Sequence, residues 1–293
     1  MILVTGAAGM SGMEIIREFV AQGVPVRALV RDRSKAGALA FNNRKVEIVE
    51  GDMSRPETLG RALSGIRKTL LISSANPQML ETQCTFVDAC KSAGVPHVVK
   101  FSGAETGFER SKFRFSKMHA QAEEYLEQSG LAWTHLRPGG FMQVYLREAR
   151  TIMERGELRL AIGDITLAPI DVVDIAKIAV AVLRAPGQEG KAYPITGPEA
   201  LTGEQIAELL SETAGLPVKY VAITPEARRR EMLAAGAPTY FADALLEQSI
   251  ERLRNPNATI HLEAHREFNV TPTYFADFAK RNASVFATSA AAL

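Results

Sequence analysis

The chain has 293 residues, 46% of them hydrophobic, which is enough for one large domain or for a domain with a smaller second lobe. Its 34 Lys and Arg residues balance 33 Asp and Glu residues, and this net charge of +1 argues against nucleic acid or an anionic membrane as a partner. No apolar run reaches the roughly 20 residues that cross a bilayer, and Met1 leads into a strand-like segment rather than a signal sequence.

The two cysteines, Cys84 and Cys90, lie six residues apart in one predicted helix, a spacing that places them on different faces. We therefore expect both thiols to be reduced. Together with the missing signal sequence, this predicts a soluble cytoplasmic protein. A small-molecule partner is expected, and a homodimer is compatible with the sequence.

Short apolar runs alternate with longer segments of helical periodicity through the first half of the chain. Predicted strands lie at 2–4, 26–30, 46–49, 69–72, 98–101 and 133–136, and predicted helices at 13–21, 59–63, 80–93 and 117–128. Because the strand segments are continuously apolar, they are expected to be buried on both sides. The alternation predicts an α/β fold of the Rossmann type, with a doubly wound parallel sheet.

After residue 140 the regular alternation weakens, and only a late strand at 192–195 and a helix at 202–214 stand out. The sequence therefore predicts a doubly wound domain at 1–140 and a smaller, mostly helical lobe at 141–293 that is interleaved with the last strands of the sheet. The tail at 287–293 is rich in small residues and is expected to be frayed.

A glycine-rich turn links the first predicted strand to the first predicted helix, and its glycines are spaced three residues apart. The first two permit a tight turn and a close approach to a pyrophosphate, and the third lets the helix pack near the strand. The helix N-terminus adds unpaired N–H groups and a partial positive charge. This context predicts an NAD(P)-binding site, with a ligand-free turn as the alternative. The candidate residues are Gly6, Ala8, Gly9, Met10, Ser11 and Gly12.

Arg31 follows the second predicted strand, where an acidic residue would hold the ribose hydroxyls of NAD. A guanidinium group at this position can pair with a 2′-phosphate, and Arg33 or Lys35 can add a second charge, so NADPH is the expected cofactor. Asp32 is the counter-argument, because an inward carboxylate would favour the unphosphorylated ribose. A solvated charged loop is the alternative interpretation.

Further candidates follow the later strands, because ligands of open α/β sheets bind outside the carboxyl ends of the strands. Asp52 and Met53 are expected near the adenine, and Ser73, Ser74 and Ala75 near the nicotinamide. Asp52 and Ser74 are also good helix caps, and that alternative stays open.

Taken in order, the motifs resemble the NmrA-like, atypical short-chain dehydrogenase/reductase family. The matching segments are 5–9, 29–31, 50–52, 102–104, His119 with Glu123, 129–131, 134–142, 169–176 and 196–198. Ser102, Pro138 and Phe141, at the ends of the fifth and sixth strands, complete the expected cofactor-binding residues.

The resemblance implies the fold and a choice of functions. Members of the family include quinone reductases, triphenylmethane-dye reductases and flavin-free azo-dye reductases, and also regulators that bind NADP without turnover. We expect an NADPH-dependent, flavin-free reductase that passes hydride to a planar conjugated acceptor such as a quinone or an azo or other aromatic dye. The alternative is an NADP(H)-sensing regulatory protein. A third option is reduction of an activated benzylic ether or an enone, which would depend on Lys117.

The standard short-chain dehydrogenase acid is missing from this sequence. A tyrosine would be expected four residues before the lysine, but Phe113 stands four residues before Lys117 and has no proton to give. The sequence therefore argues against alcohol oxidation by the standard mechanism. Lys117 and His119 are the candidate catalytic residues, Lys117 at the nicotinamide ribose and His119 as a proton donor. A surface lysine and a packing histidine are the alternatives.

Other residues are candidates for an acceptor-binding site or for a metal site. Phe141 and Met142 suit a flat apolar acceptor, with a role in the hydrophobic core as the alternative. Tyr240 and Phe241 are candidates for a roof over the pocket. We expect no metal, because Asp171 and Asp174 match the cap and first-turn charge of a helix from Val172, without a nearby His or Cys.

Overall fold

A computed structural model of the chain describes residues 1–34, 44–103, 111–255 and 257–286. Three sequence expectations lie outside these residues: the charge of Lys35, Ala104 in the family motif, and the frayed tail at 287–293. No helix within the described residues combines the length and the apolar character needed to span a membrane.

A seven-stranded sheet forms the centre of the larger unit, with the strand order β3-β2-β1-β4-β5-β6-β8. All neighbouring strands pair in parallel. The strands are β1 (Ile2–Val4), β2 (Val26–Val30), β3 (Val46–Glu50), β4 (Lys68–Leu71), β5 (His97–Phe101), β6 (Ala132–Pro138) and β8 (Lys191–Ile195). The expected doubly wound α/β fold is confirmed.

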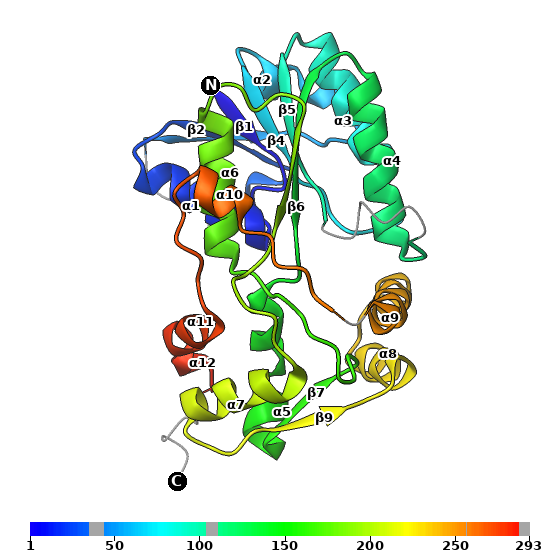
Figure 1. The fold of residues 1–293 in the computed structure, drawn as a ribbon. Coiled ribbons are helices and arrows are strands. Elements are labelled where there is room, and N and C mark those ends of the chain that lie inside the picture. The colour runs from blue at the N-terminus through cyan, green and yellow to red at the C-terminus, as the bar shows by residue number, and fades with distance from the viewer. Residues whose placement is uncertain (35–43, 104–110, 256, 287–293) are drawn as a thin grey trace.

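Helices cover both faces of this sheet (Figure 1). On one face, α1 (Met10–Ala21) and α6 (Val172–Arg184) bury a shared apolar stripe that includes Ile15, Ile16 and Phe19. On the other face lie α2 (Gly60–Leu63), α3 (Met79–Ser92) and α4 (Arg114–Gln128), after the short helix η2 (Pro56–Thr58). Burial of both faces explains why the strands are apolar without alternation.

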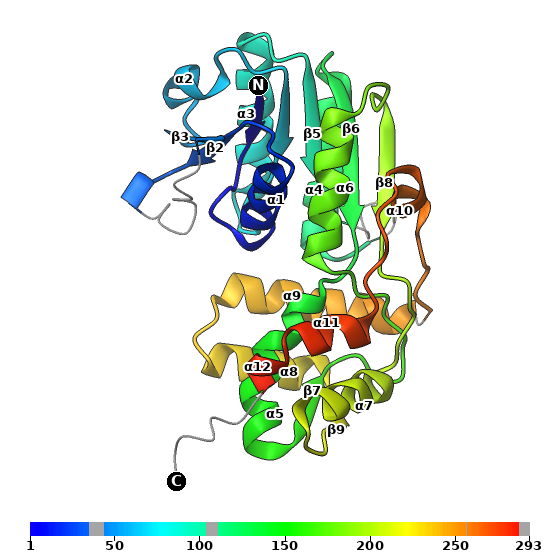
Figure 2. The same ribbon diagram turned by 90° about the vertical axis from the view of Figure 1, so that its left-hand side faces the viewer.

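A second, smaller unit lies beyond the carboxyl ends of the strands (Figure 2). It consists of η4 (Met142–Glu148), α5 (Ala149–Arg155), β7 (Glu157–Leu160), α7 (Gly203–Ala214), β9 (Lys219–Ala222), α8 (Pro225–Ala234), α9 (Thr239–Arg254), α11 (Phe275–Arg281) and α12 (Ala283–Phe286). The chain returns to the sheet between these elements to form α6, β8 and α10 (Glu263–Glu267). A two-stranded parallel sheet of β7 and β9, which the sequence analysis did not anticipate, supports the lobe.

Helix ends agree with the capping residues. Asp171 accepts a hydrogen bond from the backbone N–H of Val173 and caps α6, and Asp174 lies in the first turn, as expected. Thr202 and Gln205 form a capping box at the start of α7. Neither Cys84 nor Cys90 is in a disulfide, and burial raises the pKa of both thiols, which keeps them protonated.

Candidate active site

A cleft of about 710 Å³ opens at the carboxyl ends of β1, β2, β3 and β4. Most of the expected cofactor-binding residues line it: Gly6, Ala8, Gly9, Met10, Ser11, Gly12, Arg31, Asp52, Met53, Ser73 and Ser74. Four separate segments of the sequence thus come together at one edge of the sheet. Arg33, Ala75, Ser102, Pro138 and Phe141 are not among the described residues that line this cleft.

The glycine turn is built so tightly that a side chain does not fit at two positions. Gly6 has a φ of +58°, and a Cβ there would lie 3.0 Å from the carbonyl oxygen of Ile72. A Cβ on Gly12 would lie 2.2 Å from the carbonyl oxygen of Gly6, so the first turn of α1 rests directly on the loop. The N-cap residue Gly9 provides no side-chain cap, and the first N–H groups of α1 remain available to a ligand.

The charged residues after β2 have different partners. Arg31 is exposed and lines the cleft, and its guanidinium group is available for an anion. The carboxylate of Asp32 instead accepts hydrogen bonds from the backbone N–H and the hydroxyl of Ser34, at 2.9 and 2.6 Å. Arg33 donates to the carbonyl of Ile48 on β3 at 3.1 Å. Among the described residues of this turn, Arg31 is therefore the basic residue that lines the cleft.

The residues after β3 and β4 have local structural partners as well. The Asp52 carboxylate accepts from the backbone N–H and the hydroxyl of Ser54, and these hydrogen bonds lower the pKa of Asp52. These contacts form a local turn rather than a helix cap, because the N-cap residue of η2 is Arg55, and Asp52 also lines the cleft. Ser73 accepts a 2.8 Å hydrogen bond from the buried Gln83. Ser74 does not cap α3, which begins after Gln78.

A second cleft, of about 290 Å³, lies at the same edge of the sheet beyond β5, where β6 and β8 meet the lobe. Its floor contains Gly139 and Gly140 after β6 and Thr196 after β8. Its other walls come from the 165–168 segment and from α9, with Glu251 and Arg252. A Cβ on Gly140 would lie 3.6 Å from an Arg252 guanidinium nitrogen, so the missing side chain leaves room for α9 to approach.

Between the two clefts, a buried polar network joins β5 to α4 and β6. Lys100 of β5 is fully buried, and its Nζ donates to the Ser102 hydroxyl at 3.0 Å and lies 2.9 Å from His119 Nδ1. Glu123, one helical turn after His119, accepts two hydrogen bonds from Arg137 of β6. Lys100 and Ser102 thus lie two residues apart at the end of β5, and His119 and Glu123 lie four residues apart on α4.

Burial and charge shift the pKa values in this network. Burial lowers the pKa of Lys100 to about 7, with Glu123 opposing this effect and Arg137 adding to it. Burial, and then the charge of Lys100, hold the pKa of His119 well below its usual range. Burial alone would raise the pKa of Glu123, but Arg137, His135 and Ser102 outweigh it and the pKa is lowered. Near neutral pH, His119 is thus a neutral imidazole beside a lysine that can exist in both forms.

Phe113 and Lys117, at the positions of the standard tyrosine and lysine, lie in different surroundings. Phe113 is buried at the start of α4 and packs edge-to-face on Phe115 at 5.6 Å. Lys117 is exposed on α4. Burial alone would raise the pKa of Glu247 on α9, but its hydrogen bonds with Arg114 and the charges of Arg114 and then Lys117 lower it. His119, the other candidate, lies in the buried network, whereas Lys117 lies at the interface with the lobe.

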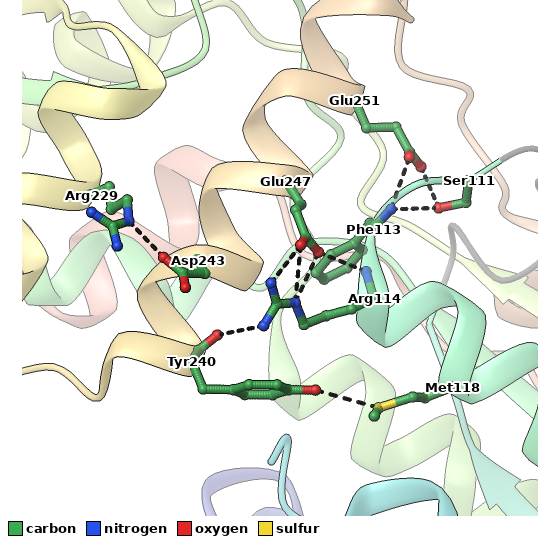
Figure 3. Close-up of polar contacts among 9 residues, drawn as sticks. All are labelled: Ser111, Phe113, Arg114, Met118, Arg229, Tyr240, Asp243, Glu247 and Glu251. Carbon is green, nitrogen blue, oxygen red and sulfur yellow. Dashed lines mark hydrogen bonds and ion pairs between the residues drawn. The ribbon is translucent and has the colours of Figure 1, made fainter. Parts of the chain in front are cut away.

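Acidic residues of α9 bind the N-terminus of α4 and join the lobe to the sheet unit (Figure 3). Glu251 accepts hydrogen bonds from the Ser111 hydroxyl at 2.6 Å and from the backbone N–H groups of Lys112 and Phe113 at 2.5 and 3.1 Å. Glu247 pairs with the guanidinium group of Arg114 and accepts from its backbone N–H. The N-cap residue of α4 has no side-chain cap of its own, so residues more than 130 positions away supply it.

The apolar candidates have mainly structural contacts. Met142 is buried in the core of the lobe, as its alternative interpretation predicted, while Phe141 lies edge-to-face on Phe101 at 6.3 Å. Tyr240 and Phe241 pack against Phe115 rather than lining either cleft.

Lys100 was not predicted as a functional residue, although its place in the strand indicates a buried partner. It is the one lysine in an otherwise apolar or aromatic strand, and a charge in such a strand requires a buried partner. The spacing of His119 and Glu123 on one helix face was the second signal.

Comparison with known proteins agrees with this architecture. The sequence model of the NmrA-like family matches residues 1–274. The chain is 38% identical to an NAD(P)H azoreductase of Xenophilus azovorans, over 98% of this chain and 99% of that protein. It is 32% identical to a (4-alkanoyl-5-oxo-2,5-dihydrofuran-3-yl)methyl phosphate reductase of Streptomyces griseus, with the same coverage.

A solved structure is similar over the same extent. The crystal structure of an Escherichia coli NADPH-dependent quinone oxidoreductase in complex with NADPH superposes with a TM-score of 0.86 and 28% identity, covering 96% of this chain and 99% of that chain. The likeness thus includes both the sheet unit and the lobe. With a family model that matches nearly the whole chain, the resemblance noted from the motifs is confirmed, and the protein belongs to the NmrA-like family.

Proposed function

We propose that this protein is an NADPH-dependent, flavin-free reductase that transfers hydride to a planar conjugated acceptor, such as a quinone or an azo or other aromatic dye. The observation that carries the proposal is the pair of clefts at one edge of the sheet, the first bounded by the glycine turn and the second by β6, β8 and the lobe. The relatives named as an azoreductase and a quinone oxidoreductase support the substrate class.

The first cleft fits a dinucleotide. Gly6 lets the loop lie against Ile72, and Gly12 lets the first turn of α1 rest on the loop, so backbone lines this part of the cleft. The uncapped N-terminus of α1 offers N–H groups to the oxygens of a pyrophosphate. Arg31 at the edge of the cleft and the locally satisfied Asp32 favour a 2′-phosphate over a free ribose hydroxyl. When bound, the cofactor supplies two electrons and one hydrogen nucleus as hydride.

The second cleft is the proposed acceptor site. Its walls include apolar side chains from Ile165 and Leu167 beside the backbone of Gly139 and Gly140, which suits a flat aromatic molecule. Since Phe113 provides no acid, the reaction requires an acceptor that is already electrophilic, and positioning supplies most of the catalysis. We assign the proton donor role to His119 of α4, whose Nδ1 lies 2.9 Å from Lys100 Nζ of β5, the strand between the two clefts.

The test is oxidation of NADPH, followed by the loss of its near-ultraviolet absorbance, against a panel of quinones, azo dyes and triarylmethane dyes. Turnover with any of these acceptors is the expected result. NADPH binding without turnover across the panel would contradict the proposal and favour the NADP(H)-sensing protein instead.

Contact of Lys117 with the nicotinamide ribose stays a prediction. Because Lys117 is exposed and close to Glu247, we expect Lys117→Ala to lower kcat/KM by only about threefold, the size of a weak surface interaction. Steady-state kinetics of this variant beside Lys112→Ala, an exposed neighbour, checks the prediction. A loss of 100-fold or more would show that Lys117 acts directly in the reaction.

A further inference from the structure

The proposed reaction leaves one atom unaccounted for, and the buried network contains a group that can supply it. A quinone that receives hydride becomes a hydroquinone monoanion and needs one proton, and an azo bond needs one proton to become a hydrazine. A triarylmethane dye cation needs none, because hydride alone converts it to the neutral leuco form. The proton source therefore separates these acceptors.

His119 by itself is a poor proton source. Its imidazole is neutral near pH 7, and a neutral ring gives up its N–H only when another proton arrives at the second nitrogen. The structure places Lys100 Nζ 2.9 Å from Nδ1, which leaves Nε2 as the nitrogen that can give a proton. His119 is not among the described residues that line either cleft, so an acceptor in the second cleft has to extend toward α4 to reach it. The Lys100 side chain has no exposed surface, so its proton can leave only through its hydrogen-bond partners.

The surroundings of Lys100 are suited to exchange of one proton. Glu123 on α4 favours the charged ammonium form of Lys100, and Arg137 on β6 disfavours it. Cys84 on α3 makes the smallest contribution and favours the ammonium form. Ser102 accepts from Nζ and so holds the amine in place beside His119. With burial, these groups bring the pKa of Lys100 to about 7, where general acids work best at neutral pH.

We propose that Lys100 is the proton reservoir of the reaction and acts through His119; this inference rests on the proposed reductase function. As the acceptor receives hydride, the His119 Nε2–H bond breaks and the proton goes to the oxygen or nitrogen of the acceptor. At the same time the Lys100 ammonium transfers a proton to Nδ1, which leaves a neutral amine and a neutral imidazole. A solvent proton that enters at Nε2 reverses the shift and restores the ammonium. Lys100 is thus a positioning and proton-supplying residue, and His119 is the group that touches the acceptor.

The first experiment follows the His119 ring by NMR in protein labelled at histidine, with His119→Gln to assign the signal. We expect a pH transition near 7 in the wild type and in Lys91→Met, an exposed lysine of α3 as control, and its loss in Lys100→Met. Absence of the transition from the wild type, or its persistence in Lys100→Met, would overturn the proposal.

The second experiment compares NADPH oxidation with a quinone and with a triarylmethane dye cation. In Lys100→Met and in His119→Gln the ratio of quinone turnover to dye turnover should fall about 100-fold, and Lys91→Met should keep it. An unchanged ratio would overturn the relay, because a merely structural defect lowers both rates together. A wild type that reduces neither acceptor would contradict the proposed function, while the NMR titration still decides whether Lys100 and His119 exchange a proton.

Discussion

The glycine cleft and the buried polar network lie side by side on the same sheet edge, yet they are built from different parts of the chain. The cleft depends on backbone geometry at Gly6 and Gly12, within a few consecutive residues. The network depends on Lys100, Glu123 and Arg137, which come from β5, α4 and β6 and meet only when these elements are packed in register. The cleft therefore depends on local backbone structure, whereas the network forms only when the elements of the fold are packed correctly.

This difference predicts how each region responds to a single substitution. A change in the glycine turn should alter binding and the adjoining helix. A change in the network should lower global stability, because a buried charge is left without its partner.

Glu123→Ala should have the largest effect on stability. It leaves the guanidinium group of Arg137 without its carboxylate and removes the hydrogen bond between Glu123 and Ser102, and breaking such a pair costs about 3 to 5 kcal/mol. Urea unfolding of this variant beside Glu124→Ala, an exposed neighbour, measures the cost. Equal stability of the two variants would show that the network is not needed for folding.

The same pair has a defined pH dependence. Because the pKa of Glu123 is lowered in the folded protein, its contribution is present above the unfolded value of about 4.5 and is lost as the pH falls through the lower folded value. The difference in unfolding free energy between the wild type and Glu123→Ala should thus shrink in acid. Because Glu123 also favours the ammonium form of Lys100, a second decline is expected as the pH rises through the Lys100 pKa of about 7. A difference that stays constant down to pH 3 would contradict this assignment.

Gly12→Ala tests the local region. The new Cβ would meet the carbonyl oxygen of Gly6 and the Cα of Ala7, so the first turn of α1 has to move, at a cost of about 2 to 3 kcal/mol. NADPH affinity, measured by titration calorimetry, should fall at least 10-fold. Gly60→Ala, where no atom lies within 4 Å, is the matched control and should retain stability and affinity. Normal NADPH binding by Gly12→Ala would show that the geometry of the glycine turn is not needed for cofactor binding.

The contrast also explains which features the sequence predicts. The strands, the glycine turn and the cap at Asp171 depend on neighbours in sequence, and they were found with small shifts at their ends. The start of α4 was placed three residues late, because its cap comes from Glu251 on α9. The role of Lys100 and the β7–β9 sheet depend on long-range packing. In the sequence, Lys100 is visible only as a charge within an apolar strand, and the β7–β9 sheet only as short runs of alternating residues.

Arg31→Ala concerns a side chain at the edge of the cleft, where only one contact is at stake. A charged hydrogen bond to a 2′-phosphate contributes about 1.5 to 3 kcal/mol, so the preference for NADPH over NADH should fall roughly 10-fold to 100-fold. The ratio of the two dissociation constants is the measurement, and Arg33→Ala, whose guanidinium group contacts Ile48, is the control. If Arg31→Ala keeps the preference, another residue reads the phosphate.

The smallest effect is expected where the two units are joined. Glu251→Ala removes the acceptor for the N–H groups of Lys112 and Phe113, and loss of a helix cap costs about 0.5 to 2 kcal/mol. Glu247 still holds Arg114, so α9 should stay docked while the start of α4 exchanges its amide protons faster. Hydrogen exchange resolved by residue, beside Glu208→Ala on the exposed face of α7, checks this. Faster exchange throughout α9 would instead mean that Glu251 alone holds the lobe against the start of α4.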